Sequence, residues 1–165
     1  MKSVEAFKKG KPALRVVQKV SGDCWGGAIS VRRADAWRCH SANHIYDPCY
    51  SKPNLAGGIV LCPTSYPWVK RAVEVSLTSP LPYRFGNPKG ASTAGRPWGI
   101  QTTDGKNCRA YTGITKLIGG KIATYMCGHG GGLLGQPRKN QKLWRIRFAQ
   151  GTKAPVWKGI KVAWY

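Results

Sequence analysis

The chain has 165 residues, 42% hydrophobic and 20% charged, and its 27 Lys and Arg against six Asp and Glu give a net charge of +21. This much apolar material supports a folded core and excludes a disordered chain. No apolar run approaches the roughly 18 residues of a membrane span, so we expect no transmembrane segment. No apolar stretch follows the N-terminal lysines either, so no signal sequence is visible in this chain.

Strand patterns begin after a polar N-terminus. Residues 1–12, with three lysines at positions 8, 9 and 11, are expected to form a flexible basic arm. Residues 13–20 and 28–33 alternate apolar and polar side chains, which predicts two short strands. Ser21-Gly22-Asp23 between them is typical of a turn.

The densest stretch of the chain is Asp35–Tyr50, which holds two cysteines, two histidines and two acids. Its Asp47-Pro48 pair is a turn signal, because proline fixes φ and Asp bonds to its own backbone. We therefore expect this stretch to be a disulfide-bonded loop between strands. Residues 59–62 and 69–78 then predict two further strands, the second with the cleanest alternation in the sequence.

Residues 79–96 are rich in Pro, Gly, Ser and Thr and interrupt the strand pattern. Structureless loops of this length are uncommon within compact domains. We expect the stretch to cross between sheets of a single β domain over residues 13–165. A linker between two halves, residues 13–78 and 97–165, is the alternative.

The C-terminal half reads as strands joined by glycine-containing turns. Asp104-Gly105 and Gly119-Gly120 are two-residue hairpin signals, and residues 127–135 are expected to form a long, flexible glycine-rich hairpin loop. No convincing amphipathic helix is present. About ten short antiparallel strands imply an all-β fold, a disulfide-stabilised sandwich or barrel. Strands of this half are predicted at residues 98–103, 121–127, 142–149 and 156–165.

An even number of cysteines and no Cys-x-x-Cys motif favour a disulfide framework and an extracellular or cell-surface location. We predict local pairs: Cys24–Cys39, Cys49–Cys62 and Cys108–Cys127. The alternative is a metal site of Cys39, His40, His44 and Cys49, whose spacing matches no common zinc finger. We expect no metal and no cofactor.

The motifs around these cysteines carry a resemblance. They are Gly22-Asp-Cys-Trp25, Arg33-Ala-Asp-Ala-Trp-Arg-Cys39 and Ile45-Tyr-Asp-Pro-Cys-Tyr50. The chain from about residue 22 to residue 165 resembles a small cysteine-rich domain of secreted and lipoprotein-type actinobacterial proteins. That resemblance implies an exported, disulfide-bonded domain and supplies no catalytic residues. It continues through Val60-Leu-Cys-Pro63, Pro67-Trp68, Leu77-Thr-Ser-Pro-Leu-Pro82, Pro97-Trp-Gly-Ile100, Asp104-Gly-Lys-Asn-Cys108 and Ala163-Trp164.

The positive charge is concentrated toward the C-terminus, where twelve Lys and Arg and no acid follow Asp104. Such a charge repels itself in the folded state, and a polyanion relieves that repulsion. Nucleic acid, an anionic cell-surface glycan and an anionic membrane surface all qualify as partners. Alternate residues of an exposed strand, such as Arg145 and Arg147, lie about 7 Å apart, near the phosphate spacing of an extended single strand. The predicted binding residues are Arg138, Lys139, Lys142, Arg145, Arg147, Lys158 and Lys161.

Aromatic residues interleave with these cations and could stack on bases or sugars. Core packing is the favoured interpretation for Trp144 and Trp164, Trp157 lies between the cations, and Tyr165 is expected to be the most accessible. We therefore hypothesise an exported, non-catalytic domain that binds nucleic acid or an anionic glycan through its basic C-terminal half.

Two other classes of function remain open. A metal-free secreted nuclease would use His40, His44 and His129 as general acid and base. Separately, hydrolysis by paired carboxylates would draw on Asp23, Asp35, Asp47 and Glu74, for which turn capping and ion pairing with nearby arginines is the favoured interpretation. A filament or surface-assembly subunit would donate residues 13–20 to a neighbouring copy. Gly130–Gly135 matches G-x-G-x-x-G formally, but no acid follows it to bind a ribose.

Overall fold

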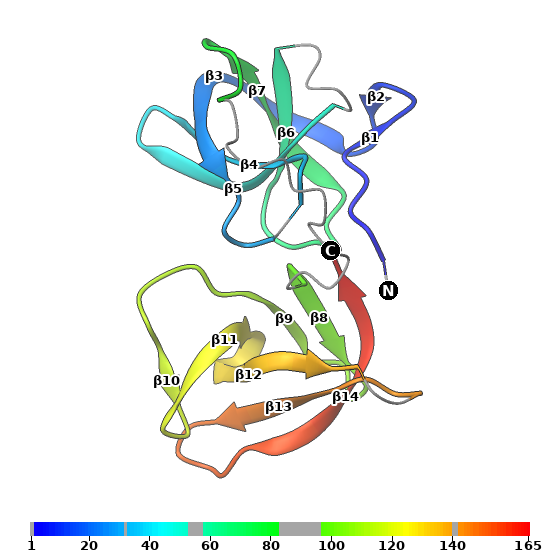
Figure 1. The fold of residues 1–165 in the computed structure, drawn as a ribbon, viewed down its shortest axis with the longest axis vertical. Helices are drawn as coiled ribbons and strands as arrows, with labels where there is room; N and C mark the ends of the chain where they lie inside the picture. The colour runs from blue at the N-terminus through cyan, green and yellow to red at the C-terminus, as the bar shows by residue number, and fades with distance from the viewer. Residues whose placement is uncertain (1, 32, 53–57, 83–96, 140–141) are drawn as a thin grey trace. The chain divides into compact units, whose positions relative to one another are not determined.

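The computed structural model describes residues 2–31, 33–52, 58–82, 97–139 and 142–165, and it is almost entirely β (Figure 1). These residues form fourteen strands and one short 3-10 helix, η2 (Gly128–Gly130), which confirms the predicted all-β class. In this part of the chain no helix has the length and apolar character needed to cross a bilayer.

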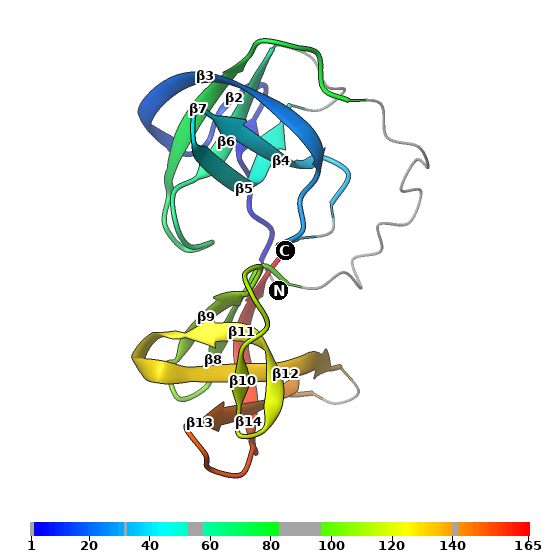
Figure 2. The same ribbon diagram turned by 90° about the vertical axis from the view of Figure 1, so that its left-hand side faces the viewer.

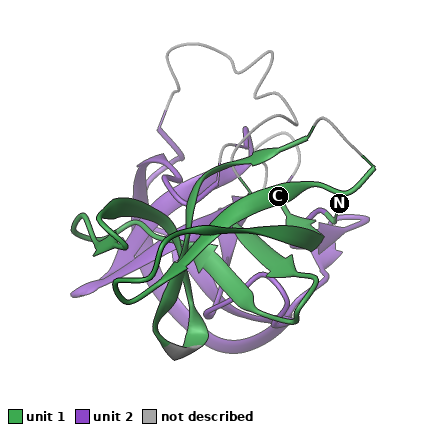
Figure 3. Ribbon diagram, turned by 90° about the horizontal axis from the view of Figure 1, so that it is seen from below, with its two compact units in different colours: residues 1–2, 96–165 green, residues 3–95 purple. Residues whose placement is uncertain are grey.

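The chain divides into two compact units, shown in purple and green in Figure 3. One comprises Ser3–Gly95 and is called the N-terminal barrel below. The other comprises Met1–Lys2 and Arg96–Tyr165 and is called the C-terminal barrel. The stretch predicted to cross between sheets, residues 79–96, lies largely outside the described residues.

The N-terminal barrel is a closed five-stranded ring in which sequence neighbours pair antiparallel. A meander with an odd number of strands ends in the direction in which it began. The first and last strands therefore close the ring as a parallel pair, against the expectation of antiparallel pairing throughout. The strands are β3 (Arg15–Gly27), β4 (Ala36–Ser41), β5 (His44–Ser51), β6 (Ile59–Pro63) and β7 (Arg71–Leu77).

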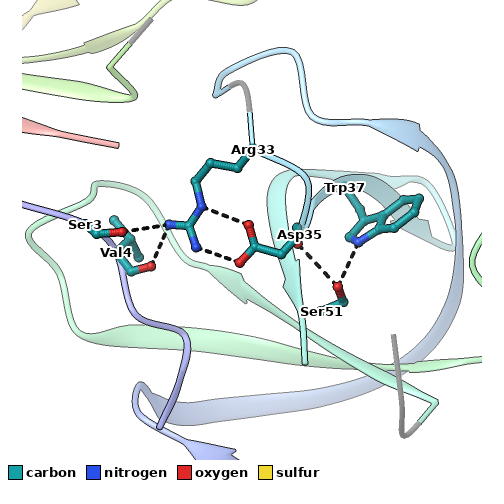
Figure 4. Close-up of polar contacts among 6 residues, drawn as sticks. All are labelled: Ser3, Val4, Arg33, Asp35, Trp37 and Ser51. Carbon is teal, nitrogen blue, oxygen red and sulfur yellow. Dashed lines mark hydrogen bonds and ion pairs between the residues drawn. The ribbon is translucent and has the colours of Figure 1, made fainter. Parts of the chain in front are cut away.

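Residues 1–12, expected to be a flexible arm, include a small hairpin of β1 (Phe7–Lys8) and β2 (Lys11–Pro12). Val4 and Ala6 are buried. Arg33 donates to the Val4 carbonyl at 2.8 Å and forms a bidentate pair with Asp35 (Figure 4). A charged network of the N-terminal barrel thus holds the start of the chain.

Two turn predictions in the N-terminal half are wrong. Strand β3 runs straight through Ser21–Asp23, and a Cβ on Gly22 would lie 2.0 Å from the His40 carbonyl oxygen, so this glycine permits close strand approach. Asp35–Tyr50 is largely the β4–β5 hairpin, with Asp47-Pro48 inside β5.

The strand predicted at residues 28–33 is also absent from the described residues of that stretch. The Asp47 carboxylate accepts hydrogen bonds from the backbone amides of Ile29 and Ser30. These donors are satisfied by a side chain, so they need no neighbouring strand. Val31 is buried nonetheless, which anchors the loop.

The C-terminal barrel closes because β11 pairs with β9 as well as with β12 (Figure 2). The ring runs β11, β12, β13, β14, β8, β9 and back to β11, and the short β10 extends the edge of β11. Ile100, Tyr125, Leu133 and Ile146 are fully buried. The strands are β8 (Gly99–Thr102), β9 (Asn107–Ala110), β10 (Leu117–Ile118), β11 (Lys121–Cys127), β12 (Gly131–Arg138), β13 (Arg145–Gln150) and β14 (Val156–Trp164).

The glycine-rich stretch 127–135 is not a long loop, which corrects the sequence prediction. After the single turn of η2, Gly131 and Gly132 belong to β12. A Cβ on Gly131 would lie 2.4 Å from the Phe148 ring, and one on Gly132 would lie 2.8 Å from Ile118. These two glycines make room for core side chains, so packing explains their presence without a bound phosphate.

The three disulfides are those predicted: Cys24–Cys39, Cys49–Cys62 and Cys108–Cys127. Each joins adjacent strands of one barrel, and Cys108 and Cys127 are register partners across the β9–β11 seam that closes the C-terminal ring. The first two bonds lie in the core of the N-terminal barrel beside Trp37 and Val75. Small barrels with little core per residue gain stability from such cross-links.

Candidate polyanion-binding surface

Three arginines come together on the outward face of β12, β13 and β14. Arg145 and Arg147 alternate with buried Ile146 and Phe148, so both arginines point to solvent. Arg138, at the end of β12, lies directly opposite Arg145. A β-bulge between Leu134 and Arg138 sets this register. Three of the seven predicted cations therefore share one sheet face.

Two of these arginines contact Trp157, which lies on β14 opposite Arg147. The guanidinium carbon of Arg138 is 4.5 Å from the Trp157 ring centroid, and that of Arg147 is 5.3 Å away. The two guanidinium carbons therefore lie within about 10 Å of each other, because both are held against one ring. We call Arg138, Arg145, Arg147 and Trp157 the arginine face.

The arginine face has no carboxylate paired with it among the residues that the structure describes. Within the described part of the chain, Arg138, Arg145 and Arg147 form no ion pair with a carboxylate. Arg138 and Arg145 lie directly opposite each other across two strands. Like charges in this arrangement repel each other and are destabilising. An anion bound at this face would remove that repulsion.

A second group of cations surrounds Trp144, at the base of the β12–β13 connection. Lys142, Trp144 and Lys161, with the apolar Ile160 and Ala163, line an open surface pocket of about 270 Å³. The Lys139 ammonium lies 5.0 Å from the Trp144 ring centroid and 5.5 Å from that of Tyr165. Because Lys139 follows Arg138 and Trp144 precedes Arg145, this group adjoins the arginine face along the chain. We call Lys139, Lys142, Trp144 and Lys161 the lysine pocket.

Lys158 stands apart from the other six predicted residues. It lies opposite buried Ile146, so it projects from the other side of the sheet from the arginine face. Its ammonium forms a 3.0 Å ion pair with Asp104. A hydrogen bond from the Thr102 hydroxyl, and then Lys158 itself, lower the pKa of the Asp104 carboxyl, so the pair stays charged at neutral pH.

The two barrels carry unequal charge. The C-terminal barrel holds 14 Lys and Arg against Asp104 alone, a net charge of +13, whereas the N-terminal barrel holds 13 against five acids, a net charge of +8. Since Lys158 pairs with Asp104, the remaining cations of the C-terminal barrel have no acid of their own unit to pair with. The electrostatic field of this unit therefore favours anions.

Aromatic exposure differs from the prediction at the C-terminus. Trp164 is buried, as expected for a core residue, and Trp144 is half-buried. Tyr165, expected to be the most accessible, is itself half-buried, and its backbone amide donates to the Lys2 carbonyl. Burial raises the pKa of the Tyr165 hydroxyl. Trp157, exposed to 41%, is instead the most exposed of the four aromatic residues considered at this end of the chain.

The histidines proposed for a nuclease do not assemble a pair on β4 and β5. His40 lies opposite Ile45, while His44 lies opposite Ser41 and packs on Tyr46 at 4.5 Å. Adjacent residues of a strand face opposite ways, so His40 and His44 project to opposite sides of the hairpin. His129 belongs to the other barrel, in η2, and its side chain lies outside the described residues.

Four acids considered for catalysis are each engaged with a different structural partner. Asp35 pairs with Arg33 at 2.6 Å, Glu74 pairs with Lys19 at 3.2 Å, and Asp23 accepts from the Thr78 hydroxyl at 2.6 Å. The Asp47 carboxylate accepts hydrogen bonds from the backbone amides of Ile29 and Ser30. Among the described residues no three His, Cys, Asp or Glu side chains cluster to hold a metal. Cys39 and Cys49 are in separate disulfides, so they offer no thiolate ligands.

Comparison with known proteins adds no assignment, because no family model, curated protein or solved structure matches this chain. The function proposed for this surface therefore rests on its geometry and charge.

Two features of the structure were not predicted from the sequence. One is the contact of Arg38 with the exposed Trp25 ring, at 5.3 Å, and the other is the exposed apolar pair Leu117 and Ile122. The alternation of apolar and polar residues along a strand does not by itself predict that an apolar side chain is exposed.

Proposed function

We propose that this protein is an exported, non-catalytic domain that binds a polyanion, in the first place nucleic acid, through the arginine face and the adjoining lysine pocket. The observation that carries the proposal is the group of Arg138, Arg145 and Arg147 on one sheet face, two of them against the exposed ring of Trp157, with no carboxylate partner among the described residues. Cations left uncompensated on a β-sheet face are suited to phosphate contacts that do not read sequence.

The exposed indole favours nucleic acid over other polyanions. Trp157 presents a partly exposed ring beside two guanidiniums, and Trp144 lines a pocket with Lys142 and Lys161 and has the Lys139 ammonium near its ring. Bases of single strands stack on such rings while the backbone tracks the cations. An anionic glycan can use the same cations and stack sugar faces on the rings, so it is the second candidate for the same surface.

Export is supported by the cysteine chemistry. All six cysteines are paired, and no free cysteine remains in the described chain. Stable disulfides persist in oxidising compartments and are rare in the cytosol. The assembly alternative has less support, because β3, which contains most of the segment thought to be donated, pairs within its own barrel on both edges, with β4 and β7.

A gel-mobility experiment tests the proposal against the nuclease alternative. Labelled single- and double-stranded DNA and RNA would be incubated with the protein with and without chelator, at low and high salt. We expect a retarded, intact band that is released as salt rises. Degradation of the nucleic acid would contradict a non-catalytic role. Absence of both retardation and degradation at low salt would remove nucleic acid and leave the glycan.

Replacing Trp157 by Ala should weaken binding of single-stranded DNA by about tenfold, because one base-stacking contact is lost. The salt dependence of affinity should stay the same, since no cation is removed. Fluorescence anisotropy at several salt concentrations measures both quantities. Trp25→Ala, which removes an indole exposed to 47% in the other barrel, is the matched control and should bind like the unaltered protein. Equal losses in the two variants would show that Trp157 has no special role.

A further inference from the structure

The β10–β11 hairpin exposes apolar side chains that the polyanion proposal does not use. Leu117 and Ile122 are register partners, so they project from the same face of the hairpin. They are exposed to 65% and 62%, and Ile114, just before the hairpin, is exposed to 89%. Leu117 and Ile122 are paired, and Ile114 lies three residues before Leu117 in the sequence. We call these three residues the hairpin tip.

The hairpin is held firmly against the barrel from its opposite face. Ile118, next to Leu117, is buried in a small cluster with Ala123, Leu134 and Ala149. Gly119 and Gly120 both have positive φ, as the predicted tight turn requires. The Gly119 amide donates to the Gly151 carbonyl at 2.9 Å, which ties the turn to the β13–β14 loop. The fold therefore holds Leu117 and Ile122 in their exposed positions.

Lysines border the hairpin tip. Lys116 directly precedes Leu117 and Lys121 directly precedes Ile122 in the sequence, and both lysines are exposed. Lys153 is exposed on the β13–β14 loop, whose backbone carbonyl at this residue would lie 2.9 Å from a Cβ on Gly119. Figures 1 and 2 both show this loop beside the turn of the hairpin. No Asp or Glu follows Asp104 in the sequence, so residues 105–165 supply no acidic side chain to offset these lysines.

We infer that the hairpin tip is a site that inserts into the surface of a lipid bilayer containing anionic lipids. A rigid hairpin with exposed Leu and Ile bordered by lysines matches such a surface. The apolar side chains enter the boundary of the acyl region, and the ammonium groups meet the lipid phosphates. Each inserted side chain gains from leaving water independently of the others.

The small size of the hairpin tip argues for a bilayer over a protein partner. A stable protein–protein interface buries roughly 800 Å² on each side, with twenty or more residues. Three apolar side chains and their bordering lysines cannot supply that area. A bilayer needs no complementary shape, and a few inserted side chains combined with electrostatic attraction give measurable, reversible binding.

Co-sedimentation with large unilamellar vesicles tests this inference. Vesicles of phosphatidylcholine alone would be compared with vesicles containing roughly 30 mol% phosphatidylglycerol. We expect the protein to bind the anionic vesicles and the Leu117→Ser/Ile122→Ser variant to bind them about 30-fold more weakly. The control Val17→Ser/Ile45→Ser removes two apolar side chains of the N-terminal barrel that are exposed to 47% and 54%. It should bind like the unaltered protein.

Several results would overturn the inference. They are no binding to anionic vesicles at low salt, equal binding by the Leu117→Ser/Ile122→Ser variant, and binding to neutral vesicles that matches binding to anionic ones. Self-association that this variant abolishes would assign the hairpin tip to a second copy of the chain. Circular dichroism and thermal unfolding establish that each variant is folded. The same variant should still bind DNA, so vesicle binding and polyanion binding can fail independently.

Discussion

Replacing Arg138, Arg145 and Arg147 together by Gln should weaken binding of single-stranded DNA by about 100-fold and reduce the slope of log affinity against log salt by about 2. Each guanidinium that neutralises a phosphate releases close to one condensed counterion from the strand, so three lost contacts account for the change in slope. Glutamine keeps much of each side chain's length, and all three positions are exposed, so the fold should be preserved. Fluorescence anisotropy over a salt series measures both effects.

The matched control removes the same charge from the other barrel. Arg15 and Arg71 are exposed register partners on β3 and β7, and Lys70 is exposed beside them. Arg15→Gln/Lys70→Gln/Arg71→Gln should change the affinity by a few-fold at most, through the net charge alone. An equal loss in both triple variants would mean that overall charge, and no particular surface, holds the ligand.

Removing the Cys108–Cys127 disulfide, by Cys108→Ser/Cys127→Ser, should destabilise the C-terminal barrel by about 3 kcal/mol. The bond closes a chain loop with a sequence separation of 19, and loop-closure entropy for such a length gives this magnitude. It also links the two strands, β9 and β11, whose pairing closes the ring. In a barrel this small, the loss corresponds to a fall of roughly 15 °C in melting temperature.

Differential scanning calorimetry measures this loss and shows which unit suffers it. We expect the transition of the C-terminal barrel to move to lower temperature, while that of the N-terminal barrel stays in place. Cys24→Ser/Cys39→Ser, which removes a bond between β3 and β4, should do the reverse. A Cys108→Ser/Cys127→Ser variant with an unchanged melting profile would show that the β9–β11 seam is held without the disulfide.

Local patterns predicted two of the three strands that position the candidate surface, β13 and β14, whereas most of β12 was expected to be a loop. The alternation of Arg145 and Arg147 with Ile146 and Phe148 is a short-range signal, and β13 follows it. The contact of Trp157 with two arginines could not be predicted. It depends on the register of three strands and on the bulge before Arg138, which are set by packing across the barrel.

Glycine was the main source of wrong predictions. Gly22 and Gly131 lie where another residue's atoms approach too closely for a side chain, and both belong to strands. In the sequence, such a glycine has the same appearance as one that permits a turn. Gly119 and Gly120, by contrast, do form the predicted turn with positive φ.

Lys158 was grouped with the binding residues because its partner, Asp104, is distant in sequence.

The salt dependence of the affinity for a short single-stranded DNA tests the central claim most directly. The arginine face and the adjoining lysine pocket offer about three to six phosphate contacts. We therefore predict a slope of log affinity against log salt between about −2 and −4. A slope near zero, or no binding at low salt, would contradict the assignment of this surface to a polyanionic nucleic acid.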